Sequence, residues 1–233
     1  MMETTLNEDD RILILASHPH DIMCQHAETE VREIGAALRS QHSSRRLVLE
    51  YRTASRPRDM HRALLEFQPT IVHLCGDARH ADPGSPDTLA SGLVMEDDRG
   101  RSFTVHAKPL AELFALFARE VRCVLLNHCA SQELIDAMAA HLDYVIGATT
   151  ESAADAAVEF AVPFYRALTA GRSIPFAHQF GCVAMKMAHY SELDLPVLVG
   201  QKVEESLHDP RRHHMSPATG PEPASHPPPG ICH

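Results

Sequence analysis

The sequence predicts an α/β fold, in which a mostly parallel β-sheet is covered by helices on both faces. Short apolar runs alternate along the chain with segments whose apolar residues recur every third or fourth position. This strand, helix, strand order is typical of parallel sheets, because parallel strands need a crossover connection. Hydrophobic residues make up 44% of the chain and charged residues 22%, which is ordinary for a globular domain and excludes wholesale disorder.

The elements of the first half follow from their patterns. The run RILILA ends at a turn that contains proline, as a buried strand would, and Pro57 stands where a helix can begin. Met60, Leu64 and Phe67 then share one helical face. The sequence therefore predicts strands at residues 11–16, 47–51 and 70–75, with helices around residues 31–38 and from residue 57 to near residue 69.

A small hairpin insertion and a second set of strands and helices are predicted in the second half. Two short apolar strands flank the turn-rich segment EDDRGR, Pro109 can open a helix, and Gly171 separates two long helical segments. The predicted strands are 93–95 and 102–105 for the hairpin, then 121–126, 144–147 and, at the sheet edge, 196–199. One helix is predicted to begin at residue 109, and three more are predicted at residues 132–141, 153–170 and 173–188.

Composition divides the chain into one domain and two flanking segments. Residues 1–10 are expected to be flexible, residues 11–203 to form the domain, and residues 204–233 to be disordered. From residue 209 the tail is rich in Pro and His and has hardly any large apolar residues, so it cannot offset its ordering entropy. His213 and His214 could bind a metal loosely, but solvated tail histidines are the favoured interpretation.

Charge and cysteine content exclude several classes of protein. Lys and Arg number 21 against 31 Asp and Glu, and a net charge of -10 argues against a nucleic-acid binder. No apolar run is long enough for a membrane span, and the acidic N-terminus is unlike a secretory signal, so a cytoplasmic location is expected. The six cysteines include no CxxC pair, so neither a zinc ribbon nor a thioredoxin-type site is indicated, and no metal or cofactor is expected.

Three turns after predicted strands form the candidate site, because sites in such folds lie beyond the carboxyl ends of the strands. They are residues 17–21, 76–80 and 127–131. Cys129 lies just before a predicted helix N-terminus, which can lower a thiol pKa and hold an oxyanion. A buried turn cysteine is the alternative. His73 and His80 lie in or near the third-strand turn, where an imidazole could form a dyad with the thiol.

The chain resembles the CHAT family of caspase-like cysteine peptidases. The resemblance covers nearly all of residues 11–200 and follows ILILASHPHD, PTIVHLCG, LVMEDDRG, VRCVLLNHCAS, DYVIGAT and DAAVEFAVPFYRALTAG in order and spacing. It implies a caspase-like three-layer sandwich with a small β-hairpin insertion. It also implies a His-Gly pair after the third strand and a nucleophilic cysteine after the fourth.

The resemblance places Cys129 on the family's nucleophile position but Asp77-Ala78 on its catalytic His-Gly. His73 matches a separate histidine earlier in that strand. Moving a proton from a thiol with a pKa of about 8.5 to an imidazole of about 6.5 costs roughly 2.7 kcal/mol, against roughly 6 kcal/mol for a carboxylate of about 3.9. Asp77 also opposes a thiolate by like-charge repulsion. Ala78 in place of glycine hinders a backbone N–H from serving an oxyanion.

Other residues are weighed as parts of the same site. His80 or His128 could replace the missing base, although a strand-like turn would point His128 away from Cys129. Asn127 could hydrogen-bond the site turn or only form the turn. Asp155 matches an acidic residue that the family carries near this helix start, where it could line a substrate pocket. With Ser152 it also fits a capping box, the favoured role, and Asp21 could brace the site or cap a helix.

Two function classes follow from this resemblance. The favoured one is a degenerate, non-hydrolytic homologue that binds a peptide or protein partner, such as a sensor or repeat-containing protein, in signalling or bacterial defence. The alternative is an active cysteine endopeptidase that uses Cys129 with a relocated histidine as base.

The motif LASHPHD also resembles the opening of zinc-dependent sugar deacetylases. His18 and Asp21 remain from that pattern, but a third metal ligand and a base are missing. A zinc-dependent hydrolase is therefore disfavoured.

Overall fold

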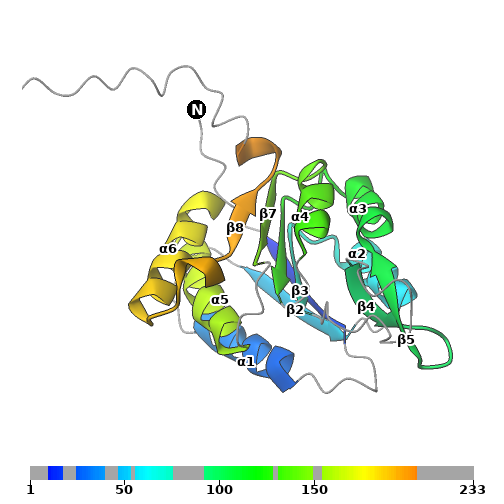
Figure 1. The fold of residues 1–233 in the computed structure, drawn as a ribbon, viewed down its shortest axis with the longest axis horizontal. Helices are drawn as coiled ribbons and strands as arrows, with labels where there is room; N and C mark the ends of the chain where they lie inside the picture. Colours follow the sequence, from blue (N-terminus) through cyan, green and yellow to red (C-terminus); the bar gives the residue numbers. More distant parts are fainter. Residues whose placement is uncertain are drawn as a thin grey trace, which may run out of the picture.

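The protein is a three-layer α/β sandwich built on a six-stranded sheet (Figure 1). The strand order is β2-β1-β3-β6-β7-β8, with all neighbours parallel except the last pair, β7 and β8. The predicted fold class is confirmed, including the separate antiparallel hairpin. The computed structural model describes residues 10–17, 25–39, 47–53, 56–75, 92–127, 131–148 and 154–203.

The strands fall close to their predicted positions. β2 extends two residues beyond its prediction, because an edge strand tolerates the charged residues Glu50 and Arg52. β8 is the predicted edge strand. The sheet contains β1 (Arg11–Ala16), β2 (Val48–Thr53), β3 (Ile71–Cys75), β6 (Cys123–Asn127), β7 (Tyr144–Gly147) and β8 (Val197–Val199), and the hairpin contains β4 (Gly92–Glu96) and β5 (Ser102–His106).

The helices also follow the predicted pattern. α3 begins two residues before Pro109, which still lies in the first turn, where a missing N–H leaves no helical hydrogen bond unmade. None of the described helices combines the length and apolarity that crossing a membrane would require. The helices are α1 (Gln25–Arg39), α2 (Pro57–Phe67), α3 (Ala107–Leu116), α4 (Gln132–Ala139), α5 (Ala154–Thr169) and α6 (Ile174–Met187), followed by a short 3-10 turn, η1 (Glu192–Asp194).

Two apolar layers separate the sheet from its helices. Because side chains alternate along a strand, Val72 and Leu74 of β3 pack in one layer, and Ile71 and Cys75 pack in the other. α2, α3 and α4 cover the first face of the sheet, and α1, α5 and α6 cover the second (Figure 1). The same alternation in β6 sends Cys123 to the second layer. His73 and Asn127 have the same parity as these residues, so they face α1 and α5.

Local sequence fixes where the helices begin and end. Ser131 caps α4 by accepting a hydrogen bond from the backbone N–H of Leu134 at 3.2 Å, and Ser173 caps α6. α2 ends at Gln68, whose left-handed backbone (φ 50°) lets its N–H bond the Leu64 carbonyl before Pro69. The cap at Ser131 starts α4 at Gln132, five residues after β6 ends at Asn127.

The hairpin is attached to the first strand of the sheet. The Ser17 hydroxyl donates a hydrogen bond to the carbonyl of Val94, and Arg58 of α2 forms an ion pair with Asp98 at 2.9 Å. Gly92 is required at its position, because a Cβ there would lie 2.1 Å from the carbonyl oxygen of Val105. The hairpin is thereby held beside the carboxyl end of β1.

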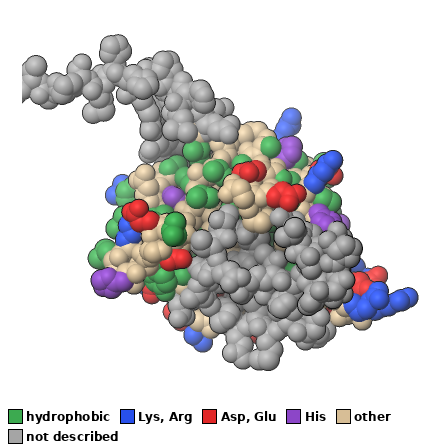
Figure 2. All heavy atoms as spheres, viewed as in Figure 1, with side chains coloured by type: hydrophobic (Ala, Val, Ile, Leu, Met, Phe, Trp, Pro, Cys, Tyr) green, Lys and Arg blue, Asp and Glu red, His purple; other side chains and the backbone are tan. Residues whose placement is uncertain are grey.

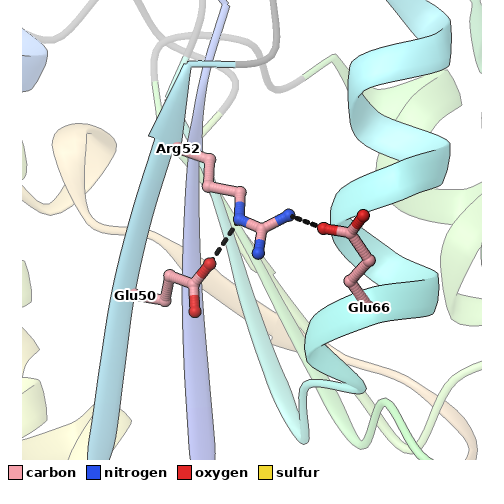
Figure 3. A network of polar contacts seen from close by, with 3 residues as sticks. All are labelled: Glu50, Arg52 and Glu66. Carbon is pink, nitrogen blue, oxygen red and sulfur yellow. Dashed lines mark hydrogen bonds and ion pairs between the residues drawn. The ribbon is translucent and has the colours of Figure 1, made fainter.

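The edge strand β2 carries a charged network (Figure 3). Arg52 pairs with Glu50 of the same strand through its Nε and with Glu66 of α2 through a terminal nitrogen at 2.7 Å. The network links β2 to α2 across the outer face of the sheet.

Candidate functional site

The carboxyl ends of β3 and β6 lie side by side. Cys75 is the register partner of Asn127, and the backbone N–H of Ser17 donates to the Cys75 carbonyl at 2.8 Å, which brings the end of β1 to the same edge. Asp77 and Cys129 each follow this register pair by two residues in the sequence. The strand order and register are therefore those that the predicted site needs.

Most of the predicted site residues lie outside the described part of the chain. Of that set the structure describes Asn127 fully, and Asp155 only as a member of the first turn of α5. The proposed roles of the others stay predictions. The residues outside the described ranges are Asp21, Asp77, Ala78, His80, His128 and Cys129, together with the tail histidines.

A buried polar group lies directly behind this edge and consists of Glu30, His73, Cys75, Asn127 and Tyr165, here called the Glu30 cluster. The Glu30 carboxylate accepts hydrogen bonds from the Asn127 amide and, at 3.5 Å, from the Cys75 thiol. Its Oε1 also lies 3.3 Å from Nε2 of His73. One carboxylate of α1 thus joins the ends of β3 and β6.

Tyr165 of α5 completes the Glu30 cluster from the opposite side of His73. Its hydroxyl lies 3.2 Å from His73 Nδ1, and the two rings stack with centroids 5.9 Å apart. With the proton on Nε2, His73 donates toward Glu30 while Nδ1 accepts from the Tyr165 hydroxyl. In this tautomer Nδ1 accepts a hydrogen bond from Tyr165, while the Nε2 N–H faces the Glu30 carboxylate at 3.3 Å.

Burial controls the protonation of the Glu30 cluster. Desolvation raises the pKa of Glu30 to about 7, although the hydrogen bonds from Cys75 and Asn127 oppose this change. Burial also raises the pKa of Tyr165 well above its ordinary value, so that phenol stays neutral. The carboxyl group of Glu30 therefore changes charge near neutral pH.

The structure answers whether His73 could serve as a base. Its side chain is 0% exposed and is enclosed between Glu30 and Tyr165. A fully buried histidine that already contacts two polar partners is poorly placed to act as a general base for a thiol in the turn beyond the sheet edge. His73 is a core residue.

Sequence reasoning missed Glu30 and Tyr165 as partners of this histidine. A signal for Glu30 was present, since it precedes Ile34 by four positions and Ala37 by seven, on the buried face of α1. An acidic residue on an apolar helical face predicts a buried polar partner. Tyr165 had no such signal, because it is one aromatic residue among several in α5.

A thiol–imidazole contact occurs on α6 between Cys182 and His178, which lie one helical turn apart. The Cys182 sulfur lies 3.6 Å from Nε2 of His178, and that nitrogen is 2.8 Å from the carbonyl of Pro196. Because Nε2 must donate to the carbonyl, it cannot accept the thiol proton. Burial raises the pKa of Cys182 and lowers that of His178, so this pair is not an activated dyad.

The Glu30 cluster contains three potential metal ligands, but their donor atoms already contact one another. Glu30, His73 and Cys75 offer oxygen, nitrogen and sulfur atoms within 4.8 Å of one another. These atoms already satisfy one another by hydrogen bonds or close polar contact, and the side chains of Glu30 and His73 are at most 2% exposed. The arrangement is that of a hydrogen-bonded core.

Comparison with known proteins identifies the family. The CHAT domain matches residues 6–179 of this chain. A curated protein from an unknown prokaryotic organism, Roc-COR-CHAT protease, is 25% identical over 199 residues, which cover 81% of this chain and 18% of that protein. The chain thus spans less than a fifth of that relative's length. With an α/β sandwich, a parallel register between β3 and β6, and a family match over most of its length, this chain belongs to the CHAT domain family, a caspase-like peptidase family.

Proposed function

We propose that this chain binds a peptide or protein partner at the carboxyl edge of its sheet without cleaving it. The proposal rests on the sequence resemblance, which matches Asp77, a carboxylate, to the family's catalytic histidine. The enclosure of His73 supports it, since this histidine of β3 is not available to replace the base. A partner from signalling or bacterial defence, such as a cytoplasmic sensor or repeat-containing protein, fits the family.

An active cysteine endopeptidase is the second candidate function. It is favoured by the cysteine retained at position 129 and by α4, which begins three residues later with a capped N-terminus. In this mechanism Cys129 attacks a peptide carbonyl, and His80 or His128 takes the thiol proton and returns it to the leaving amine. The relative's name includes a protease, and for this chain that activity is a proposal.

Alkylation kinetics distinguish the two functions. Iodoacetamide labelling of Cys129 is followed by mass spectrometry between pH 6 and pH 9, with glutathione as a reference thiol and Cys182 as an internal one. The binding function predicts a rate that follows a thiol pKa of about 8.5 or above, because Asp77 opposes the thiolate. Labelling at pH 6 that is many times faster than that of glutathione would contradict it.

Restoring the base tests whether its loss explains the missing activity. Asp77→His is expected to raise cleavage of an unstructured protein such as casein about 100-fold or more over background, and Cys129→Ser should abolish the gain. Asp77→Asn is the matched control, since it removes the charge without supplying a base. Cleavage by the unmodified chain that is lost in Cys129→Ser but kept in Asp77→Asn would instead establish the endopeptidase.

A further inference from the structure

Helix α6 carries a stripe of apolar side chains on its outer side. Phe176, Phe180, Val183 and Met187 are 44%, 48%, 52% and 78% exposed, and they follow one another at intervals of four, three and four residues. The opposite side of α6 is buried against α5 through Ile174, Ala177, Gly181 and Met185. The helix is therefore apolar on both sides, a pattern that a helix with one solvent face does not need.

The start of this stripe borders a groove of about 480 Å³ between α5 and α6. Phe176 and Phe180 form one wall with their rings nearly parallel at 13° and centroids 6.2 Å apart. Small side chains, among them Ala170 and Ala184, also line the groove, which is partly open to solvent. Figure 2 shows hydrophobic side chains reaching the surface on the side of the molecule where α5 and α6 lie.

Two arginines give the groove a positive charge. Arg166 and Arg172 line it, no acidic side chain does, and the Arg172 guanidinium lies 5.0 Å from the Phe176 ring centroid. Within the described ranges neither arginine forms an ion pair. A basic groove on a chain of net charge -10 favours a ligand that brings carboxylates.

We propose that α6 and the adjoining groove bind an acidic amphipathic helix of a partner protein. Intervals of four, three and four are those of a coiled-coil seam, and the stripe runs for about 16 Å, or about three helical turns. Leucine-like side chains of the partner cover the stripe while its flanking carboxylates face Arg166 and Arg172. A second copy of this chain would bring the same arginines instead of carboxylates. The surface is separate from the carboxyl edge of the sheet and does not depend on the proposed function.

Designed peptides test this surface on the full chain. Three fluorescein-labelled helical peptides of equal length carry leucine at the seam with glutamate flanks, leucine with lysine flanks, or serine with glutamate flanks. Fluorescence anisotropy at physiological salt is expected to show the leucine–glutamate peptide binding at least tenfold more tightly than either of the others. Equal binding of the two leucine peptides, or no binding of the acidic one at 100 µM chain, would overturn the proposal.

Surface variants connect the binding to these residues. Val183→Glu places a charge on the exposed stripe and should weaken binding of the acidic peptide at least tenfold. Leu65→Glu on α2 is the control: it alters a side chain that is 66% exposed and should leave binding unchanged. Replacing both Arg166 and Arg172 by Glu should reverse the preference to the lysine peptide. Analytical ultracentrifugation tests whether a second copy of this chain binds the surface instead. A dimer of the unmodified chain that Val183→Glu dissociates would assign the surface to that second copy and overturn the proposal of an acidic helix.

Discussion

Glu30 connects helix α1 to two neighbouring strands through hydrogen bonds from Cys75 and Asn127. A buried carboxylate destabilises a fold unless polar groups surround it. Here two donors bond its oxygens, and His73 Nε2 lies 3.3 Å from one of them. These contacts fix the ends of β3 and β6, and both strands lead into the turns that carry the predicted site. The Glu30 cluster therefore links the protonation of one carboxyl group to the packing behind that site.

The pH dependence of stability should report the charge of Glu30. Its pKa is about 7 in the folded chain and near 4.5 when unfolded, so the folded state binds the extra proton and loses stability as pH rises from about 4.5 to 7. Glu30→Gln cannot ionise. The free energy of unfolding of the native chain minus that of Glu30→Gln should therefore fall by on the order of 2 kcal/mol between pH 5 and pH 8. Urea titrations at four pH values measure it, and a difference that is flat or rises with pH would contradict the assignment.

Tyr165→Phe isolates the far side of the Glu30 cluster. The substitution keeps the ring and removes only the hydroxyl, which leaves His73 Nδ1 buried without its partner. The expected loss is about 1–3 kcal/mol in the free energy of unfolding. Urea denaturation measures it, and Phe164→Tyr serves as the converse control, since it adds a hydroxyl to a fully buried ring of the same helix. An unchanged midpoint for Tyr165→Phe would show that the hydroxyl does not bond His73.

At the scale of elements, the contact between α5 and α6 depends on a glycine. A Cβ on Gly181 would lie 2.7 Å from two ring carbons of Phe160. That ring is only 1% exposed and is held by Phe164 and His178, so it cannot move aside. The close approach fixes the inner side of α6 and turns its other side toward solvent.

Gly181→Ala should destabilise the protein although alanine favours helices. Overpacking against Phe160 costs about 1–3 kcal/mol, which exceeds the gain of about 0.5–1 kcal/mol from replacing a helical glycine. Gly35→Ala in α1 is the matched control, because its Cβ would meet mainly the flexible end of Arg39 at 3.2 Å. In thermal unfolding, the midpoint temperature of Gly181→Ala should be several degrees lower than that of the native chain, whereas that of Gly35→Ala should be unchanged or raised. The reverse order would show that α6 is not held against α5 by this contact.

The elements were predictable because their signals are local. Apolar runs mark the strands, and Pro57, Pro109 and Gly171 mark where helices begin or are separated, without reference to the rest of the chain. The parallel order of β3 and β6 followed from the family resemblance and from the strand–helix alternation. The Glu30 cluster was not predictable, because it joins residues from α1, β3, β6 and α5 that no local pattern relates.

At the scale of the whole molecule, histidines dominate the charge balance. The chain has 17 of them against a net charge of -10, and its isoelectric point is about 5.9. Because an ordinary imidazole gains its proton at a pH of about 6.5, mild acidification removes most of the net negative charge. Electrostatic repulsion between molecules should decline as this net charge falls.

Solubility should fall accordingly between pH 7.5 and pH 5.5. Turbidity of a concentrated solution is expected to rise as pH approaches about 6 and to fall again below the isoelectric point. Added salt at pH 7.5 is the control, since it screens charge without titrating histidine. A flat turbidity profile across this range would show that net charge does not keep the molecules apart.

The outermost strand of the sheet has a consequence for crowded solutions. Among the described strands β2 lies at the end of the sheet and pairs with β1, and a strand in that position could template an additional strand from another molecule. Glu50 and Arg52 stand on that strand, and Glu66 of α2 anchors the arginine (Figure 3). An incoming chain would have to strip these ionic groups of water before pairing, so we expect the network to disfavour the addition of a strand at this edge.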